Sequence, residues 1–136
     1  MAYLWVAIGG ALGTMARFWL ANTMAVLTGA EFPWGTLIIN ILGSFVISFF
    51  GMLTGTAPRF AVSYDTRVFV TVGLCGGFTT FSSFSLQTIE LLRTGQAGRA
   101  GIYIAASVIL CLAACALGFW LATVLGNHTG GSRPAL

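Results

Sequence analysis

Charged residues are scarce in this sequence, and their positions leave long apolar stretches between them. Only 7% of the 136 residues are charged, against roughly 25% in an ordinary soluble domain. Four stretches, 3–27, 34–54, 68–92 and 102–125, each reach the about 20 residues with which a helix crosses a bilayer. We therefore predict an all-α integral membrane protein with one domain of four transmembrane helices, residues 1–128, and a short flexible tail at 129–136.

The third stretch has a polar centre. It carries no charge from residue 68 to residue 89, yet residues 76–85 read GGFTTFSSFS. A glycine costs about 1 kcal/mol relative to alanine in a helix interior, so the Gly76-Gly77 pair predicts a break in the third helix at mid-membrane. Free carbonyls at such a break suit a cation, and free N–H groups suit an anion.

Polar side chains beyond the glycine pair share one narrow sector of the expected helix. They are Thr80, Ser83, Gln87 and Glu90. Phe81 and Phe84 flank this sector, and such a pair is common in core packing. The alternative is that their positively polarised ring edges, beside hydroxyl donors, favour a small anion.

Two further side chains stand out in the first two stretches. Gly9, Gly13 and Arg17 share one helix face, where the glycines permit close helix packing. A guanidinium near the hydrocarbon faces water, a carbonyl cluster or an anion, or it reaches the interface along its aliphatic stem. In the second stretch Asn40 offers two amide donors that its own helix cannot satisfy, so we predict a functional or inter-helix role for it.

The fourth stretch carries weakly polar groups along a stripe that shifts slowly around the expected helix. The stretches as a whole contain few groups that could serve catalysis. Tyr103, Ser107 and Cys111 follow at steps of four. No His or Lys lies within the stretches, so the sequence does not favour an enzyme. The six arginines are scattered singly, which argues against a nucleic-acid partner. We interpret the three cysteines as packing thiols.

Loop charges leave the orientation nearly undecided. One side of the membrane would hold Arg59, Arg67 and Arg133, and the other Arg93 and Arg99. This near balance favours insertion in both orientations, and two opposed copies can then close an antiparallel homodimer. The alternative, that the first helix alone fixes the orientation, stays open.

Three segments resemble the small bacterial fluoride channel family, often called Fluc and CrcB-like. They read GGALG at 9–13 followed by Arg17, WGTLIINILGS at 34–44, and GGFTTFSSFS at 76–85. The resemblance covers all four stretches. It implies an antiparallel, dual-topology homodimer in the bacterial inner membrane, with two fluoride pores and a structural sodium ion at the dimer centre.

The resemblance also implies roles for particular residues. The sodium ion would bind the backbone carbonyls of Gly76 and Thr79, and Arg17 is a candidate for anion attraction. The residues expected at the fluoride pore are Asn40, Thr80, Phe81, Ser82, Ser83, Phe84, Tyr103 and Ser107. Two positions depart from the family pattern: Gln87 replaces an expected glutamate, and Cys111 replaces an expected serine.

The sequence thus predicts a passive fluoride-selective channel that relieves fluoride toxicity, with fluoride, a second copy and the bilayer as its partners. One alternative is a small four-helix drug/proton antiporter of dual topology, although such coupling needs a carboxylate in the first helix, which this chain lacks. Another is a membrane anchor or assembly subunit without transport of its own.

Overall fold

The computed structural model describes residues 1–55 and 61–128, and every regular element in this part of the chain is helical. The elements are α1 (Ala2–Thr28), α2 (Trp34–Leu53), α3 (Tyr64–Val68), the π-helical segment η1 (Phe69–Leu74), α4 (Cys75–Phe78), α5 (Phe81–Arg93) and α6 (Ala97–His128). The tail predicted at 129–136 lies outside the described residues.

Four helical stretches are long and apolar enough to cross a membrane, which confirms the predicted number. They are Ala2–Thr28, Trp34–Leu53, Tyr64–Arg93 and Ala97–Leu125. The third begins earlier than predicted because Ser63 caps it, its Oγ accepting the Thr66 N–H at 3.1 Å. The fourth begins earlier because Gly95, at φ 76°, ends the preceding turn and the chain re-enters a helix at once.

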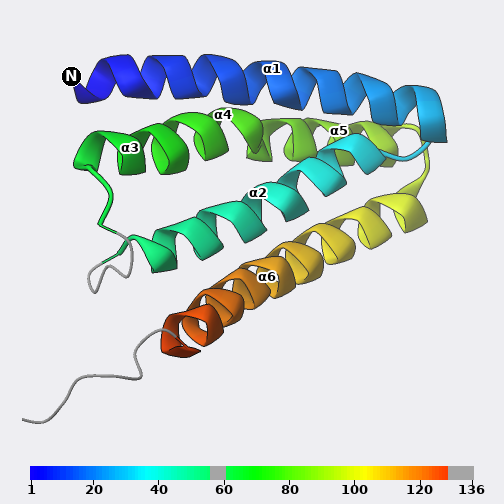
Figure 1. Cartoon of the computed structure of the whole chain (residues 1–136). Coiled ribbons are helices and arrows are strands. Elements are labelled where there is room, and N and C mark those ends of the chain that lie inside the picture. Colours follow the sequence, from blue (N-terminus) through cyan, green and yellow to red (C-terminus); the bar gives the residue numbers. More distant parts are fainter. Residues whose placement is uncertain (56–60, 129–136) are drawn as a thin grey trace, which may run out of the picture.

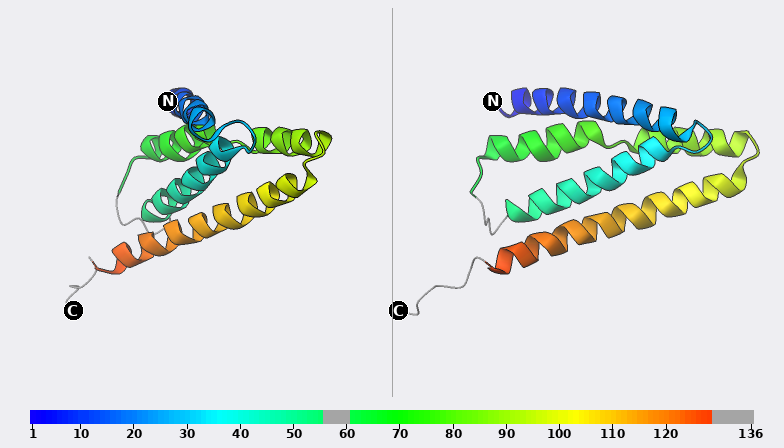
Figure 2. Two further views of the ribbon diagram at one scale, coloured as in Figure 1. Left: turned by 90° about the vertical axis from the view of Figure 1, so that its right-hand side faces the viewer. Right: turned by 45° about the vertical axis from the view of Figure 1, so that its right-hand side comes forward.

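The spans pack as two pairs, and the helices of one pair run at an angle to those of the other (Figures 1 and 2). α1 lies along η1 and α4, whereas α2 packs along α6. Gly9 and Gly13 make the first contact possible: a Cβ on Gly9 would lie 2.6 Å from the Phe69 carbonyl oxygen, and one on Gly13 would overlap the Leu74 carbonyl oxygen. The predicted packing role of these two glycines is confirmed.

The third span is broken, as predicted, but at Thr79 and Thr80 rather than at the glycine pair. Both threonines are extended, with ψ of 156° and 112°, whereas Gly76 and Gly77 belong to α4. Gly77 is small for a different reason, since a Cβ there would lie 2.5 Å from the Gly10 carbonyl oxygen. The glycine provides close approach to α1, and the threonines interrupt the helix.

Little of the apolar surface is buried within the chain. The buried cluster is small and consists of Leu37, Leu91, Ala100 and Tyr103. Large apolar side chains are exposed on every span, among them Phe18, Trp19, Val72, Phe81 and Ile109. A surface of this kind needs lipid or another apolar surface around it, in agreement with a membrane protein.

Candidate functional site at the broken third span

Asn40 on α2 holds the break from one side. Its Nδ2 donates to the Thr80 carbonyl at 3.1 Å, and its Oδ1 accepts the Thr80 N–H at 2.8 Å. The side-chain amide therefore takes both polar backbone groups of one residue, as a neighbouring backbone would. This confirms the inter-helix role predicted for Asn40, and one amide hydrogen remains for another acceptor.

Thr80 also gathers hydroxyl groups at the start of α5. Its Oγ1 accepts the Ser83 N–H at 3.2 Å, which caps the helix. The same oxygen lies 3.1 Å from Ser83 Oγ and 3.2 Å from Ser82 Oγ. The structure therefore brings the three predicted hydroxyl residues of this segment together.

The carbonyls released by the break have different partners. Arg17 Nε donates to the Gly77 carbonyl at 3.1 Å, and Thr14 Oγ1 lies 3.4 Å from the same oxygen. The carbonyls of Gly76 and Thr79 receive no hydrogen bond from any residue that the structure describes, because the Thr80 and Ser83 N–H groups bond side chains instead. The Phe78 carbonyl also accepts no hydrogen bond from the described residues, so three unpaired acceptors remain at the break.

The two predicted phenylalanines lie next to the hydroxyl cluster in the sequence, and their rings connect it to the buried core. The ring centroids of Phe81 and Phe84 are 5.4 Å apart, and those of Phe84 and Tyr103 are 5.2 Å apart. Phe84 packs against the buried cluster, whereas Phe81 is 78% exposed. Phe81 thus presents its ring outward from a single chain, beside the hydroxyl groups.

The two predicted residues of α6 are both buried. Tyr103 is 0% exposed, and its hydroxyl donates to Gln87 Oε1 at 2.9 Å. Ser107 is 8% exposed, and its Oγ has no hydrogen-bond partner among the described residues. A buried hydroxyl without a partner is rare and costly, so Ser107 retains an unused donor one turn from Tyr103.

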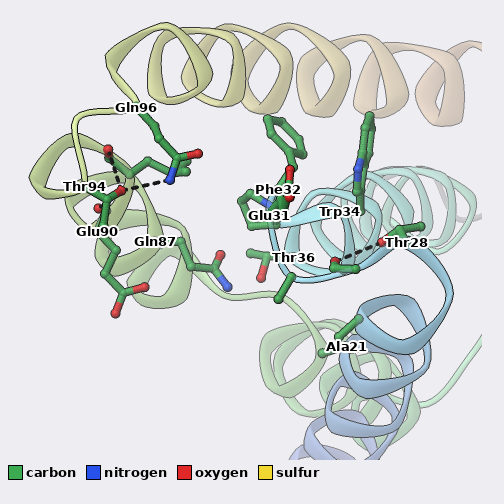
Figure 3. Close-up of a pocket in the computed structure, with 16 residues that line it drawn as sticks. Ala21, Thr28, Glu31, Phe32, Trp34, Thr36, Gln87, Glu90, Thr94 and Gln96 are labelled. Atoms are coloured by element: carbon green, nitrogen blue, oxygen red, sulfur yellow. Dashed lines mark hydrogen bonds between the residues drawn. The ribbon is translucent and has the colours of Figure 1, made fainter.

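A pocket of about 360 Å³ opens beside Gln87, between the α1–α2 turn and the far end of α5. In Figure 3 Gln87 and Thr36 point toward one another across it, from α5 and α2. An ion pair of 2.9 Å between Glu31 and Arg99 joins the turn to α6. Segments far apart in the chain line this pocket, so no local sequence pattern predicts it.

Sequence reasoning also missed Thr14 as a contact of the break. Its position three residues before Arg17 puts both on one helix face, and this was the only available signal. Arg17, for which several surroundings were considered, has a backbone carbonyl as its partner. Neither the anion-binding nor the sodium-binding role is tested by these contacts.

Fold and site define a small four-span helical membrane protein in which a broken third span, together with an amide from α2, presents hydroxyl, amide and carbonyl groups suited to an ion. Residues 4–119 match the CrcB-like protein family, Camphor Resistance (CrcB). The chain belongs to this family, as the three sequence segments predicted. It is a multi-pass protein of the bacterial inner membrane.

Relatives match over nearly the whole chain. The fluoride-specific ion channel FluC of Methylocella silvestris is 55% identical over 130 residues, covering 96% of this chain and 99% of the relative. Those of Opitutus terrae and Gluconobacter oxydans are 51% and 54% identical, covering 94% and 96% of this chain and 97% and 89% of the relatives. These names describe ion channels rather than enzymes, and they give no support to the antiporter alternative.

Proposed function

We propose that this chain is a passive fluoride-selective channel that exports fluoride across the bacterial inner membrane, and not an enzyme. The observation that carries the proposal is the cluster of neutral hydroxyl and amide groups at the third-span break, in a chain about half identical to fluoride-specific channels over nearly its full length. Export relieves toxicity because fluoride that enters as neutral HF dissociates in a more neutral cytoplasm and is trapped there as the anion.

The site chemistry suits conduction of a small anion. A permeating ion must be stabilised enough to enter but weakly enough to leave, and neutral donors meet both requirements better than a fixed cation. Hydroxyls of Thr80, Ser82 and Ser83 lie together, and Asn40 keeps one amide hydrogen free. The rings of Phe81 and Phe84 add polarised edges without any full charge.

We infer that Tyr103 and Ser107 extend this row of donors along α6. Ser107 keeps a buried hydroxyl without a partner, so an anion beside it would restore a hydrogen bond rather than cost one. Tyr103 already donates to Gln87, and its hydroxyl reaches an anion only if that bond is exchanged. Gln87, in place of an expected glutamate, keeps this region uncharged.

A single chain presents half of the proposed pathway. Phe81 is 78% exposed at the break, and an outward ring beside ion-binding hydroxyls is explained if a second copy covers it. The near balance of arginines across the membrane supports two opposed orientations. We therefore propose an antiparallel homodimer with a two-fold axis in the membrane plane.

The residues at the break fit a sodium ion, which would be structural. Carbonyl oxygens suit hard cations, and those of Gly76 and Thr79 accept no hydrogen bond from the described residues. Two copies meeting at this point would supply four such oxygens. These carbonyls, which otherwise stay unpaired in the membrane, would join the two copies by coordinating the same sodium ion.

Flux from liposomes tests the proposal. Purified protein in vesicles loaded with fluoride should release it once valinomycin provides a potassium shunt, and vesicles loaded with chloride should release little. Protein-free vesicles are the control. Vesicles that hold their fluoride although the protein is folded and inserted would contradict the channel, and drug uptake driven by a pH gradient would support an antiporter instead.

A further inference from the structure

Arg17 has a backbone carbonyl, not a carboxylate, as its partner. Its Nε donates to the Gly77 carbonyl at 3.1 Å, and Thr14, on the same face of α1, lies 3.4 Å from that oxygen. Among the described residues the one ion pair joins Arg99 and Glu31, so the charge of Arg17 is not neutralised by a side chain there. Two donors from α1 thus converge on one oxygen.

The Gly77 oxygen that they hold belongs to the same break as the carbonyls that have no donor among the described residues. With α4 ending at Phe78, the carbonyls of Gly76, Gly77, Phe78 and Thr79 all lack their usual helical donors. Only that of Gly77 is claimed by α1. A hydrogen bond from a guanidinium is stronger than a neutral one, so this carbonyl is strongly fixed.

We propose that Arg17 is a positioning residue, which fixes the Gly77 carbonyl against α1 and so withdraws it from a cation that the Gly76 and Thr79 carbonyls would bind. It is not an anion-attracting pore residue. The inference rests on the sodium site of the proposed function. It assigns to α1 the selection of which carbonyls at the break can bind an ion.

The two roles of Arg17 differ in what they require. Attraction of an anion needs only a positive charge, which lysine also carries and which salt screens. Fixing the Gly77 carbonyl needs the planar Nε–H donor at its present position, which lysine does not reproduce. Arg17→Lys and Arg17→Gln therefore separate charge from geometry, and Thr14→Val removes the longer contact to the same oxygen as a matched control.

Fluoride flux from liposomes is the first arm. We expect the fluoride flux of Arg17→Lys to fall as strongly as that of Arg17→Gln, by roughly tenfold or more, as for the loss of a charged hydrogen bond. The ratio of variant flux to wild-type flux should be the same at low and high ionic strength. The flux of Thr14→Val should fall less. Wild-type flux in Arg17→Lys, or a defect in Arg17→Gln that added salt removes, would overturn the proposal.

The second arm needs no variant and no flux, so it stands even if a substitution prevents folding. Infrared spectra of wild-type protein carrying a ¹³C=¹⁸O label at Gly76 or at Gly77 report each carbonyl separately. Without sodium, the Gly77 band should lie at lower frequency, because Arg17 bonds it. Adding sodium chloride, but not choline chloride, should shift the Gly76 band and leave the Gly77 band unchanged.

Equal band frequencies without sodium, or a sodium shift at Gly77, would overturn the role of Arg17. A low Gly77 frequency with no sodium shift at either label would support the contact with Arg17 while contradicting the sodium part of the proposed function. The two claims can therefore fail separately.

Discussion

At the scale of single residues, the site depends on side chains that replace backbone partners. Asn40 bonds both polar groups of Thr80, and Thr80 in turn caps α5. The sequence indicated that Asn40 needed a partner outside its own helix, because a helix cannot satisfy its amide. It did not indicate Thr80, since that pairing depends on how α2 meets the break, 40 residues along the chain.

Asn40→Asp is expected to impair the channel. The carboxylate can still accept the Thr80 N–H but has no donor for the Thr80 carbonyl, and it adds a charge that repels an anion. A buried group left unpaired costs about 1–3 kcal/mol, so we expect a lower melting temperature together with lower fluoride flux from liposomes. A variant with full flux would show that Asn40 serves packing only.

Phe84→Ile is expected to lower flux while the protein stays folded. The substitution removes the ring whose centroid lies 5.4 Å from that of Phe81. It keeps a branched apolar side chain that still packs against the buried cluster. The matched control is Phe49→Ile, which alters the stacked Phe45–Phe49 pair on α2. This variant should conduct like the parent. Equal flux in both variants would remove Phe84 from the pathway.

At the scale of elements, the sequence predicted that the third span is broken but not where the break lies. Its apolar length and polar centre predicted a broken membrane helix, and the structure confirms it. The glycines suggested the wrong position, because their low helix propensity was taken as the cause of the break when it reflects packing against α1. The π-helical turn at Phe69–Leu74 has no sequence signature that we could identify.

Gly77→Ala is expected to separate α1 from α4. Its Cβ would lie 2.5 Å from the Gly10 carbonyl oxygen, a backbone atom that can move only with the helix, so we expect a loss of about 1–3 kcal/mol, as for overpacking. Thermal unfolding in detergent measures it. Gly101→Ala, whose Cβ meets nothing within 4 Å, is the control, and equal melting temperatures would contradict the close approach.

At the scale of the whole molecule, four spans and short connections followed directly from the spacing of charges. The sequence could not show which spans lie together, since that depends on small residues meeting backbone across pairs such as Gly13 and Leu74. It also could not show the pocket beside Gln87. The ring of Phe81, exposed at the break, is the feature of the single chain that the proposed second copy would cover.

Dual topology predicts that one position is reached from both sides of the membrane. Glu31→Cys places a thiol in the α1–α2 turn at the cost of an exposed ion pair worth little. With both orientations present, an impermeant maleimide should label about half of this thiol in intact spheroplasts and the rest after permeabilisation. The parent, whose three cysteines lie within the spans, is the control, and labelling from one side only would contradict dual insertion.

Passive conduction selective for fluoride is measured by the reversal potential of the purified protein in a planar bilayer. With opposed fluoride and chloride gradients, the reversal potential should lie at the equilibrium potential of fluoride and should not change when a pH gradient is added. A reversal potential that follows chloride would contradict selectivity, and one that moves with the pH gradient would contradict passive conduction.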